Sequence, residues 1–425
     1  MGQFRPEIPA WLANLAHERG LSRRGLLRLL GTGGAAAVLM ACAEVRVPAG
    51  TEQALSPAAG EPESASTIGG EDAATAFYKD TTPFLQYGEK GLESLLADMQ
   101  GFVTPNRLFF VRNNSTSMDV TTDDWRLSVN GDAVSHPQEF TYADIRRLPS
   151  RTVVSYLECA GNQRAMFDLV KGQAAQGTQW MTGAVGNAAW TGVALRDVLE
   201  LAGVSADAVS VLLVGLDADS PEGGWRRALP IEKAIDPDTL LAYAMNGEDL
   251  SKDHGYPLRA LVPGWVGSAS VKWLSRIVVS AEQHWTRNNT SSYVLIGDAY
   301  PPEGQALGKV LTTQVIKSAL ALPWPAALAA GPHRLRGYAH SPFGPIAQVE
   351  WSTDAGSTWQ DARVLEPQIQ HSWARFEFAW DAPAGEYTLM TRATDAAGNI
   401  QPNEIPFNEK GYLFNQPLPH PVRVA

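Results

Sequence analysis

The pattern of apolar residues changes near residue 310, and this change most constrains the fold that the chain can adopt. From about residue 77 to 309, short strand-like runs alternate irregularly with long glycine-rich loops and with helical spacing at 195–202, which Gly203 ends. From about 310 to 425, short alternating runs follow one another with turn formers between them. The first part is therefore predicted to be an α+β domain and the second a β-sandwich.

The strand predictions rest on short runs of apolar and β-branched residues that are bounded by turn formers. The runs of the first part lie at 108–112, 125–129, 153–157 and 209–214. Those of the second part lie at 334–339, 347–352, 359–365, 373–380 and 387–393. Asp354 and Asp395 lie between or after these strands, where turn formation is favoured over calcium binding.

The first 42 residues are predicted to be an export signal rather than part of the fold. Arg23 and Arg24 precede an apolar run at 29–41, which is about 13 residues long and too short to span a bilayer. The arginine pair resembles a twin-arginine signal, which would carry the protein to the periplasm or another extracytoplasmic location. A basic amphipathic helix is the alternative.

Cys42 ends the string Leu39-Met40-Ala41-Cys42, which resembles a bacterial lipobox. Cys42 would then be the lipid-anchored first residue of the mature chain, whereas ordinary cleavage near Ala41 or Ala43 is the alternative. Residues 43–76 are rich in Ala, Glu, Ser, Gly and Pro and are predicted to be a flexible linker. The folded domains are accordingly expected at 77–309 and 310–425.

Charge and cysteine content exclude several classes of protein. Lys and Arg number 34 and Asp and Glu number 45, and this net charge of −11 argues against a nucleic-acid-binding protein. The two cysteines, Cys42 and Cys159, are too few for a disulfide scaffold, an all-cysteine zinc site or a self-ligated iron–sulfur cluster. The chain has no Cys-x-x-Cys-His string, so no covalently attached haem is expected.

Cys159 is the one cysteine of the predicted domains, and it follows a predicted strand directly. The small residues Ala160 and Gly161 after it would allow a bulky ligand to approach, and Arg164 would favour a thiolate. A thiolate is a soft metal ligand. Two alternatives remain at this stage: a buried structural cysteine, and a cysteine hydrolase that needs a histidine partner, for which His136 is the nearest candidate.

The string Glu-Cys-Ala-Gly-Asn-Gln-Arg at 158–164 resembles the molybdenum-ligand motif of the sulfite oxidase family. Further strings at 109–113, at 215–219 and at 253–274 are similar to that family and follow the same order. The second part resembles its dimerisation domain. The resemblance covers about 80 to 425 and implies an α+β molybdopterin-binding domain of the sulfite oxidase fold, followed by an immunoglobulin-like β-sandwich dimerisation domain.

The resemblance also implies roles for individual residues. Cys159 would donate its thiolate to molybdenum, beside the dithiolene of molybdopterin. Arg112 and Arg164 would bind a small anionic sulfur substrate, because a guanidinium contacts an oxyanion well. Trp180 would form a wall of the substrate pocket. The residues implied to bind the cofactor's phosphate or pterin are His254, Arg259, Lys272, Asn113 and Asp217.

Two departures from the family pattern leave the substrate open. Direct spacing puts Asn289 where many sulfite oxidases have a site tyrosine, and Tyr293 follows four residues later, as in the sulfane dehydrogenase branch. The family's late arginine falls at Lys410, which keeps the charge but loses the planar fork. Arg112, Arg164, Trp180, Tyr293 and Lys410 are nevertheless the predicted catalytic set.

The expected activity is oxidation of sulfite to sulfate with water as the oxygen source. No haem module is recognised in the chain, so the electrons are expected to pass to a separate acceptor such as a cytochrome, or directly to oxygen. The alternatives are another sulfur substrate, either protein-bound sulfane sulfur or a sulfoxide, and a non-enzymatic exported binding module.

The second part is also expected to form a homodimer, as in the family that it resembles. Phe376, Phe378 and Trp380 alternate along one predicted strand and belong to an aromatic-rich part of the chain. Some of these aromatic residues are expected to be left over from the sandwich core and available to a subunit interface. The alternative is that all of them fill the core.

Overall fold

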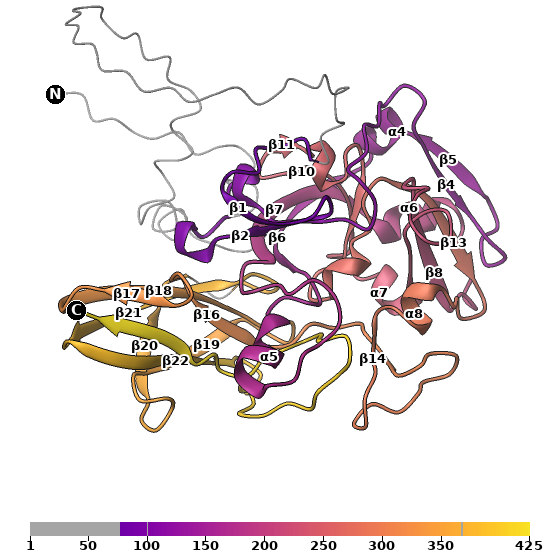
Figure 1. Ribbon diagram of the computed structural model, residues 1–425. Coiled ribbons are helices and arrows are strands. Elements are labelled where there is room, and N and C mark those ends of the chain that lie inside the picture. The colour runs from indigo at the N-terminus through magenta and orange to yellow at the C-terminus, as the bar shows by residue number, and fades with distance from the viewer. Residues whose placement is uncertain (1–76, 100, 367–368) are drawn as a thin grey trace, which may run out of the picture.

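The computed structural model describes residues 77–425 apart from residues 100, 367 and 368 (Figure 1). The arginine pair, Cys42 and the linker lie outside the described residues, so the signal, lipidation and linker stay predictions. Within the described residues, no helix is long and apolar enough to cross a membrane.

The first domain is built on two five-stranded sheets and a small three-stranded sheet. The small sheet has the order β1 (Phe84–Tyr87), β2 (Gly91–Ser94), β3 (Val111–Arg112). The sheet that leads to Cys159 has the order β11 (Glu248–Asp249), β10 (Leu240–Met245), β7 (Val185–Ala194), β6 (Ser150–Glu158), with β12 (Arg259–Leu261) also paired to β10. The other has the order β5 (Gln138–Thr141), β4 (Arg126–Asn130), β13 (Leu274–Ser280), β8 (Ser210–Gly215), β9 (Arg226–Pro230).

Short helices connect these strands. The α-helices are α4 (Tyr142–Arg147), α5 (Ala165–Lys171), α6 (Leu195–Leu201), α7 (Ile231–Ala234) and α8 (Arg287–Thr290). The 3₁₀ helices are η2 (Leu96–Asp98), η3 (Asn106–Leu108), η4 (Lys252–His254) and η5 (Gly267–Ala269). A short hairpin of β14 (Val294–Leu295) and β15 (Lys309–Val310) leads toward the second domain.

The main core of the first domain lies between the two large sheets and includes α6. Alternate residues of β4, β8 and β13 point into it, as the twofold period of a strand requires. Val198 and Leu199 of α6 pack against them. The helical spacing predicted at 195–202 is confirmed, and Gly203 follows the helix with φ +67°. The α+β prediction is confirmed.

One strand prediction of the first domain is wrong in its extent. The segment 108–112 is not one strand, because η3 ends at Leu108 and only Val111 and Arg112 pair with β2. The carbonyl oxygens of Asn106 and Phe109 instead accept hydrogen bonds from the Lys79 ammonium group, at 3.0 and 2.7 Å. Tertiary contacts therefore replace strand pairing in this segment.

The second domain is one curled sheet of eight strands, consistent with an immunoglobulin-like sandwich. Every strand predicted there is present. The order is β16 (Lys317–Leu320), β18 (Gly331–His340), β21 (Ala374–Ala382), β20 (Gln360–Val364), β19 (Ile346–Ser352), β22 (Gly385–Asp395), β23 (His420–Val424), β17 (Ala326–Leu328). Asp354 and Asp395, the last residue of β22, each precede a turn, and their carboxylates accept backbone hydrogen bonds from that turn.

The aromatic residues of β21 do not form a free surface. Phe376, Phe378 and Trp380 are 0%, 5% and 8% exposed and belong to the core of the second domain. The ring of Trp351 stacks on that of Phe378 with centroids 4.2 Å apart. These three residues therefore fill the core, because the sheet curls over them and buries them within the subunit. Of the other aromatic residues of this part, Phe343 is 55% exposed, so the expectation that some of them are available to a partner subunit stays a prediction.

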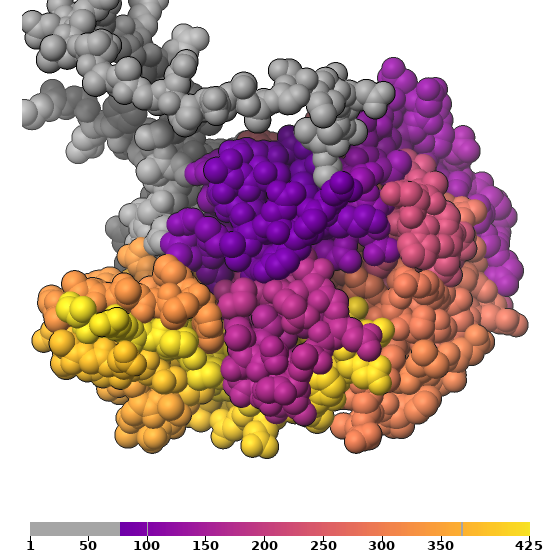
Figure 2. Space-filling view, in the orientation of Figure 1, coloured from indigo at the N-terminus to yellow at the C-terminus, as the bar shows by residue number. Residues whose placement is uncertain are grey.

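Residues 396–419, between β22 and β23, form a C-terminal segment that returns to the first domain and packs along α5 (Figures 1 and 2). Phe167 of α5 makes edge-to-face contacts with Phe407 and Phe414 at centroid distances of 5.5 and 5.1 Å. Lys171 of α5 donates a hydrogen bond to the carbonyl oxygen of Ile405 at 3.0 Å. These contacts bring residues after 400 close to the Cys159 loop.

Candidate cofactor and substrate site

A deep hollow of about 720 Å³, counted to its open mouth, lies in the first domain next to Cys159. Of the predicted site residues, eight line it together: Arg112, Asn113, Cys159, Asp217, His254, Arg259, Lys272 and Tyr293. They come from segments far apart in the sequence, so only the fold brings them into one site.

Cys159 is a free thiol that lies directly after the last residue of β6. Its backbone N–H donates to the carbonyl oxygen of Ala184 at 2.9 Å, and its carbonyl oxygen accepts from the N–H of Asn162 at 3.0 Å. A Cβ atom at Gly161 would lie 2.6 Å from the guanidinium of Arg164. Glycine at this position therefore lets Arg164 pack against the cysteine loop.

Three residues that line the hollow, His254, Arg259 and Lys272, form a cluster of buried cationic and imidazole groups together with Lys79. Lys79 donates to Nε2 of His254 at 3.0 Å. Arg259 donates to the carbonyl oxygens of His254 and Ser270 at 3.0 and 3.1 Å, and Lys272 donates to that of Asp253 at 2.6 Å. We call Lys79, His254, Arg259 and Lys272 the cation cluster.

Burial makes the charged forms of the cation cluster unfavourable in the absence of an anion. It lowers the pKa of Lys79 to about 8 and that of Arg259 to about 9. Burial, and then the positive charges around them, also lower the pKa of His254 and of Lys272 well below the usual values. A bound dianion would reverse these shifts, because it would pair with several of the charges at once.

Lys79 and Asp253 belong to this end of the site, although the sequence analysis did not identify them. The Asp253 carboxylate accepts hydrogen bonds from the N–H groups of Tyr78 and Lys79 and, at 2.6 Å, from the hydroxyl of Ser117. It therefore ties the start of the domain to η4, which carries His254. Lys79 has no sequence signal of its own, since it lies 175 positions from the histidine that it contacts.

The residues of the hollow fit a molybdenum cofactor bound through a phosphorylated pterin. Cys159 offers one soft thiolate, and the cation cluster suits the phosphate. Among the described residues, no group of three or more His, Cys, Asp or Glu side chains gathers as a metal site. The other metal ligands would therefore come from the cofactor. Nη1 of Arg112 is buried and has no hydrogen-bond partner among the described residues, so it can bind a ligand.

Two of the predicted substrate residues, Arg164 and Trp180, do not line the hollow. Arg164 contacts the cysteine loop, and it donates to the carbonyl oxygens of Thr178 and Lys410 at 2.7 Å each. Trp180 is 1% exposed and packs on Tyr87 at a centroid distance of 4.9 Å, in the apolar cluster that includes Cys159.

Tyr293 and Asn289 have different surroundings. Tyr293 lines the hollow. Burial raises its pKa, and the positive charges of Arg112 and Arg164 oppose the rise. Asn289 is buried in α8, where its side-chain oxygen accepts from the hydroxyl of Thr286 at 2.9 Å. Of these two candidates for the position of the family's tyrosine, Tyr293 is therefore the one that faces the site.

The side chain of Lys410 points to Gln176, whose side-chain oxygen lies 3.3 Å from Nζ. The nearby aromatic residue of this segment is Tyr412, which the sequence analysis missed. Its ring stacks on Tyr293 at 5.4 Å with planes 10° apart, and the Arg164 guanidinium lies 5.0 Å from its centroid. The C-terminal segment thus adds an aromatic ring beside the hollow.

Arg227 is a second residue near the site that the sequence analysis missed. It is fully buried in β9, donates to the carbonyl oxygens of Asn288 and Leu311, and lies 5.6 Å from the centroid of the Tyr293 ring. Burial lowers its pKa to about 10. Arg227 therefore supports the ring of Tyr293 from inside the protein.

This fold and this site are those of the molybdopterin-dependent oxidoreductases. The family models that match are the oxidoreductase molybdopterin binding domain, over residues 114–287, and the Mo-co oxidoreductase dimerisation domain, over residues 283–422. The sulfite oxidase of Gallus gallus is 34% identical over 73% of this chain and 71% of its own length, and that of Arabidopsis thaliana is 32% identical over 74% and 86%. The chain belongs to the sulfite oxidase family.

A solved structure gives the same result for the fold. The crystal structure of the sulfane dehydrogenase SoxCD from Paracoccus pantotrophus is similar with a TM-score of 0.69 and 30% sequence identity, over 79% of this chain and 86% of that chain. The match to the mitochondrial sulfite oxidase of Drosophila melanogaster covers only 59% of that protein's length. The predicted family and fold are thus confirmed.

Proposed function

We propose that this protein is an exported molybdenum-cofactor oxidoreductase that oxidises sulfite to sulfate. The reaction converts sulfite and water to sulfate, two protons and two electrons, and the electrons would go to an external acceptor such as a cytochrome. One observation carries the proposal: a single hollow is lined by the free thiol of Cys159, by Arg112, whose Nη1 has no hydrogen-bond partner among the described residues, and by three members of the cation cluster.

The roles of the residues follow from their contacts. Cys159 would hold the metal by its thiolate, and the cation cluster would bind the phosphate of the pterin. When bound, the cofactor supplies a two-electron acceptor and oxygen-atom transfer. Nη1 of Arg112, which has no partner in the described part of the chain, would orient the anionic substrate. The raised pKa of Tyr293 keeps its hydroxyl protonated and able to donate a hydrogen bond.

A second candidate substrate is sulfane sulfur bound to a carrier protein. Two observations favour it: the Lys410 side chain is turned toward Gln176, and the aromatic rings of Tyr293 and Tyr412 stand beside the hollow. A pocket with fewer free cations suits a less charged sulfur group. The similarity to SoxCD, named a sulfane dehydrogenase, supports this alternative.

A steady-state assay with sulfite and ferricyanide, together with elemental analysis, tests these proposals. Sulfite-dependent reduction by protein that contains about one molybdenum atom per chain is the expected result. Molybdenum-loaded protein that does not oxidise sulfite would reject sulfite and favour the carrier-bound substrate. Protein purified from a molybdenum-replete host without the metal would instead support a non-enzymatic binding module.

Export and assembly are also part of the proposal. The arginine pair and Cys42 support export by the twin-arginine route with a lipid anchor, and cell fractionation tests it. The match to a dimerisation domain supports a homodimer.

A further inference from the structure

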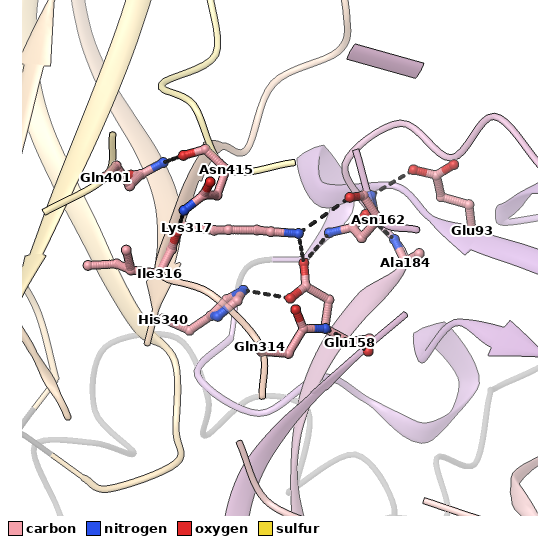
Figure 3. Close-up of polar contacts among 11 residues, drawn as sticks. Glu93, Glu158, Asn162, Ala184, Gln314, Ile316, Lys317, His340, Gln401 and Asn415 are labelled. Carbon is pink, nitrogen blue, oxygen red and sulfur yellow. Dashed lines mark hydrogen bonds and ion pairs between the residues drawn. The ribbon is translucent and has the colours of Figure 1, made fainter. Parts of the chain in front are cut away.

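A buried ion pair joins the two domains directly beside Cys159 (Figure 3). Nζ of Lys317 lies 2.8 Å from Oε1 of Glu158, and the two side chains are 2% and 0% exposed. Glu158 is the last residue of β6 and precedes Cys159, whereas Lys317 is the first residue of β16 in the second domain. The pair therefore connects the second domain to the loop that carries the thiol.

Lys317 holds both ends of this loop. Besides Glu158, its ammonium group donates to the carbonyl oxygen of Asn162 at 3.3 Å. The Asn162 side chain donates to Oε1 of Glu158 at 2.9 Å and accepts from the N–H of Ala184 at 3.0 Å. The residues on either side of the turn 159–161 are thus linked to one another through a charged group of the other domain.

The backbone before Cys159 is held as well. The side chain of Gln314 donates to the carbonyl oxygen of Glu158 at 3.1 Å. A Cβ atom at Gly267 would lie 2.7 Å from that same oxygen, so glycine is needed for the close packing. Because Gln314 and Lys317 belong to one segment, a short stretch of chain at the start of the second domain contacts both the backbone and the side chain of Glu158.

The charge of Glu158 is balanced mainly by Lys317. His340 is the other titratable partner, with Nε2 3.5 Å from Oε2 of Glu158, and its ring stacks on Tyr156 at 4.2 Å. Burial lowers the pKa of His340 to about 4, so it is uncharged near neutral pH. Within the described part of the chain, Lys317 is the lysine or arginine that forms a salt bridge with Glu158.

We propose that Lys317 and Glu158 are positioning residues that orient the Cys159 thiol toward the hollow, so that the second domain controls the geometry of the cysteine ligand. The metal that Cys159 binds rests on the proposed function, but the effect on the cysteine loop does not. Removing one member of a buried ion pair leaves an uncompensated charge, whereas replacing both members by neutral groups does not. The double replacement is therefore expected to rescue the single one.

The first test uses cofactor-free full-length protein with Cys42→Ala, in which Cys159 is the only cysteine. The alkylation rate of Cys159 by iodoacetamide is measured at one fixed pH. Lys317→Met is expected to raise the rate about tenfold, because the Glu158 carboxylate is left buried without its counter-charge and the loop rearranges around it. The double variant Glu158→Gln/Lys317→Met is expected to return it to within about twofold of the parent.

Tyr338→Phe is the matched control, because it removes a different buried contact between the domains. The Tyr338 hydroxyl donates to the carbonyl oxygen of Met99, which lies outside the cysteine loop. This variant is expected to lower the melting temperature and leave the alkylation rate unchanged. If Lys317→Met behaves in the same way as Tyr338→Phe, then Lys317 only docks the domains and the proposal is wrong.

The second test uses holoenzyme and molybdenum K-edge absorption, which counts sulfur neighbours of the metal. Lys317→Met should lose part of the sulfur contribution and the double variant should regain it; equal spectra in all three proteins would reject the proposal.

If Lys317→Met does not fold, Glu158→Gln replaces it, and an unchanged alkylation rate in that variant also rejects the proposal. Wild-type protein without molybdenum would overturn the proposed function and leave the alkylation test valid.

Discussion

At the scale of single residues, Arg112 and Lys410 differ in what they can offer an anion. Nη1 of Arg112 is buried and has no hydrogen-bond partner among the described residues, whereas Nζ of Lys410 contacts Gln176 away from the hollow. A buried donor without a partner gains most from a ligand, because its desolvation has already occurred. Arg112 is therefore expected to contribute more than Lys410 to substrate binding.

Arg112→Gln should raise KM for sulfite by about tenfold to a hundredfold, which corresponds to about 1.5–3 kcal/mol for a charge-assisted hydrogen bond. Lys410→Gln is the matched replacement and should change KM by less than about threefold. Steady-state kinetics of the two variants at equal molybdenum content is the measurement. A larger effect of Lys410→Gln would mean that its side chain turns toward the substrate during catalysis.

Cys159→Ser should abolish turnover and lower the molybdenum content while the fold is kept. A hydroxyl is too basic and too hard to replace a thiolate at this metal. Metal analysis, activity and circular dichroism are measured together, with Cys42→Ala as the control that keeps activity. Substantial sulfite oxidation by the serine variant would contradict the assignment of Cys159 as a metal ligand.

At the scale of elements, η4 and its neighbours gather positive charge that the fold does not neutralise. The negative charge of Asp253 raises the pKa of Lys79 and of Lys272 against the effect of burial, and its carboxylate also binds the backbone at Tyr78 and Lys79. The cation cluster can therefore bind an anion, and without an anion it lowers the free energy of unfolding. Its cost depends on pH, because its pKa values are lowered in the folded chain.

The cofactor-free protein should become more stable between about pH 8 and 10.5. The pKa of Lys79 is 10.5 in the unfolded chain and about 8 in the folded chain. In this window the unfolded chain therefore still holds a proton on Lys79 that the folded chain has released. The free energy of unfolding therefore rises with pH, by about 2 kcal/mol from pH 7.5 to 9.5 for this one group. Denaturant titrations at the two pH values measure the change.

Lys79→Met should remove that increment, and the exposed Lys309→Met is the control that should keep it. The same Lys79 variant should retain less cofactor, because the phosphate loses a positive charge. An equal pH dependence in Lys79→Met and the parent protein would show that Lys79 does not titrate in this window.

At the scale of the whole molecule, the second domain contributes to the site of the first. Tyr412 stacks on Tyr293, and Lys317 contacts the loop of Cys159. The large aromatic residues of β21 are used within the subunit, so a dimer must form through other surfaces. Among the described residues of this domain, Phe343 and Ile400 are the most exposed large apolar side chains, each 55% exposed.

Light scattering of the exported protein at micromolar concentration should give a mass of about twice 42 kDa, at ~110 Da per residue after signal removal, because the second domain matches a dimerisation family. Phe343→Asp should weaken the dimer if this surface forms the interface, and Phe378→Leu, in the core, should lower stability without changing the mass. A monomer at all concentrations tested would contradict the prediction of a homodimer.

Local sequence was enough to predict much of the fold. Strands such as β6 and β8 follow from continuous apolar runs, and α6 follows from helical spacing with Gly203 behind it. The strand predicted at 108–112 failed because the carbonyl oxygens of Asn106 and Phe109 bond to Lys79 rather than to a neighbouring strand. A contact between residues about 30 positions apart leaves no periodic signal.

For the site as well, the sequence predicted some of the residues and only the structure identified the others. Motifs around Cys159, His254 and Arg259 predicted residues that the structure gathers in one hollow, because soft ligands and phosphate-binding cations are specific residue types at characteristic spacings. By itself, the sequence determined the family, the two domains and this cofactor chemistry. Only the tertiary structure decided that Tyr293 rather than Asn289 faces the hollow, that Lys410 turns away, and that Lys317 holds the cysteine loop. Those outcomes depend on which distant side chains share a buried space, and burial arises only when both domains pack together.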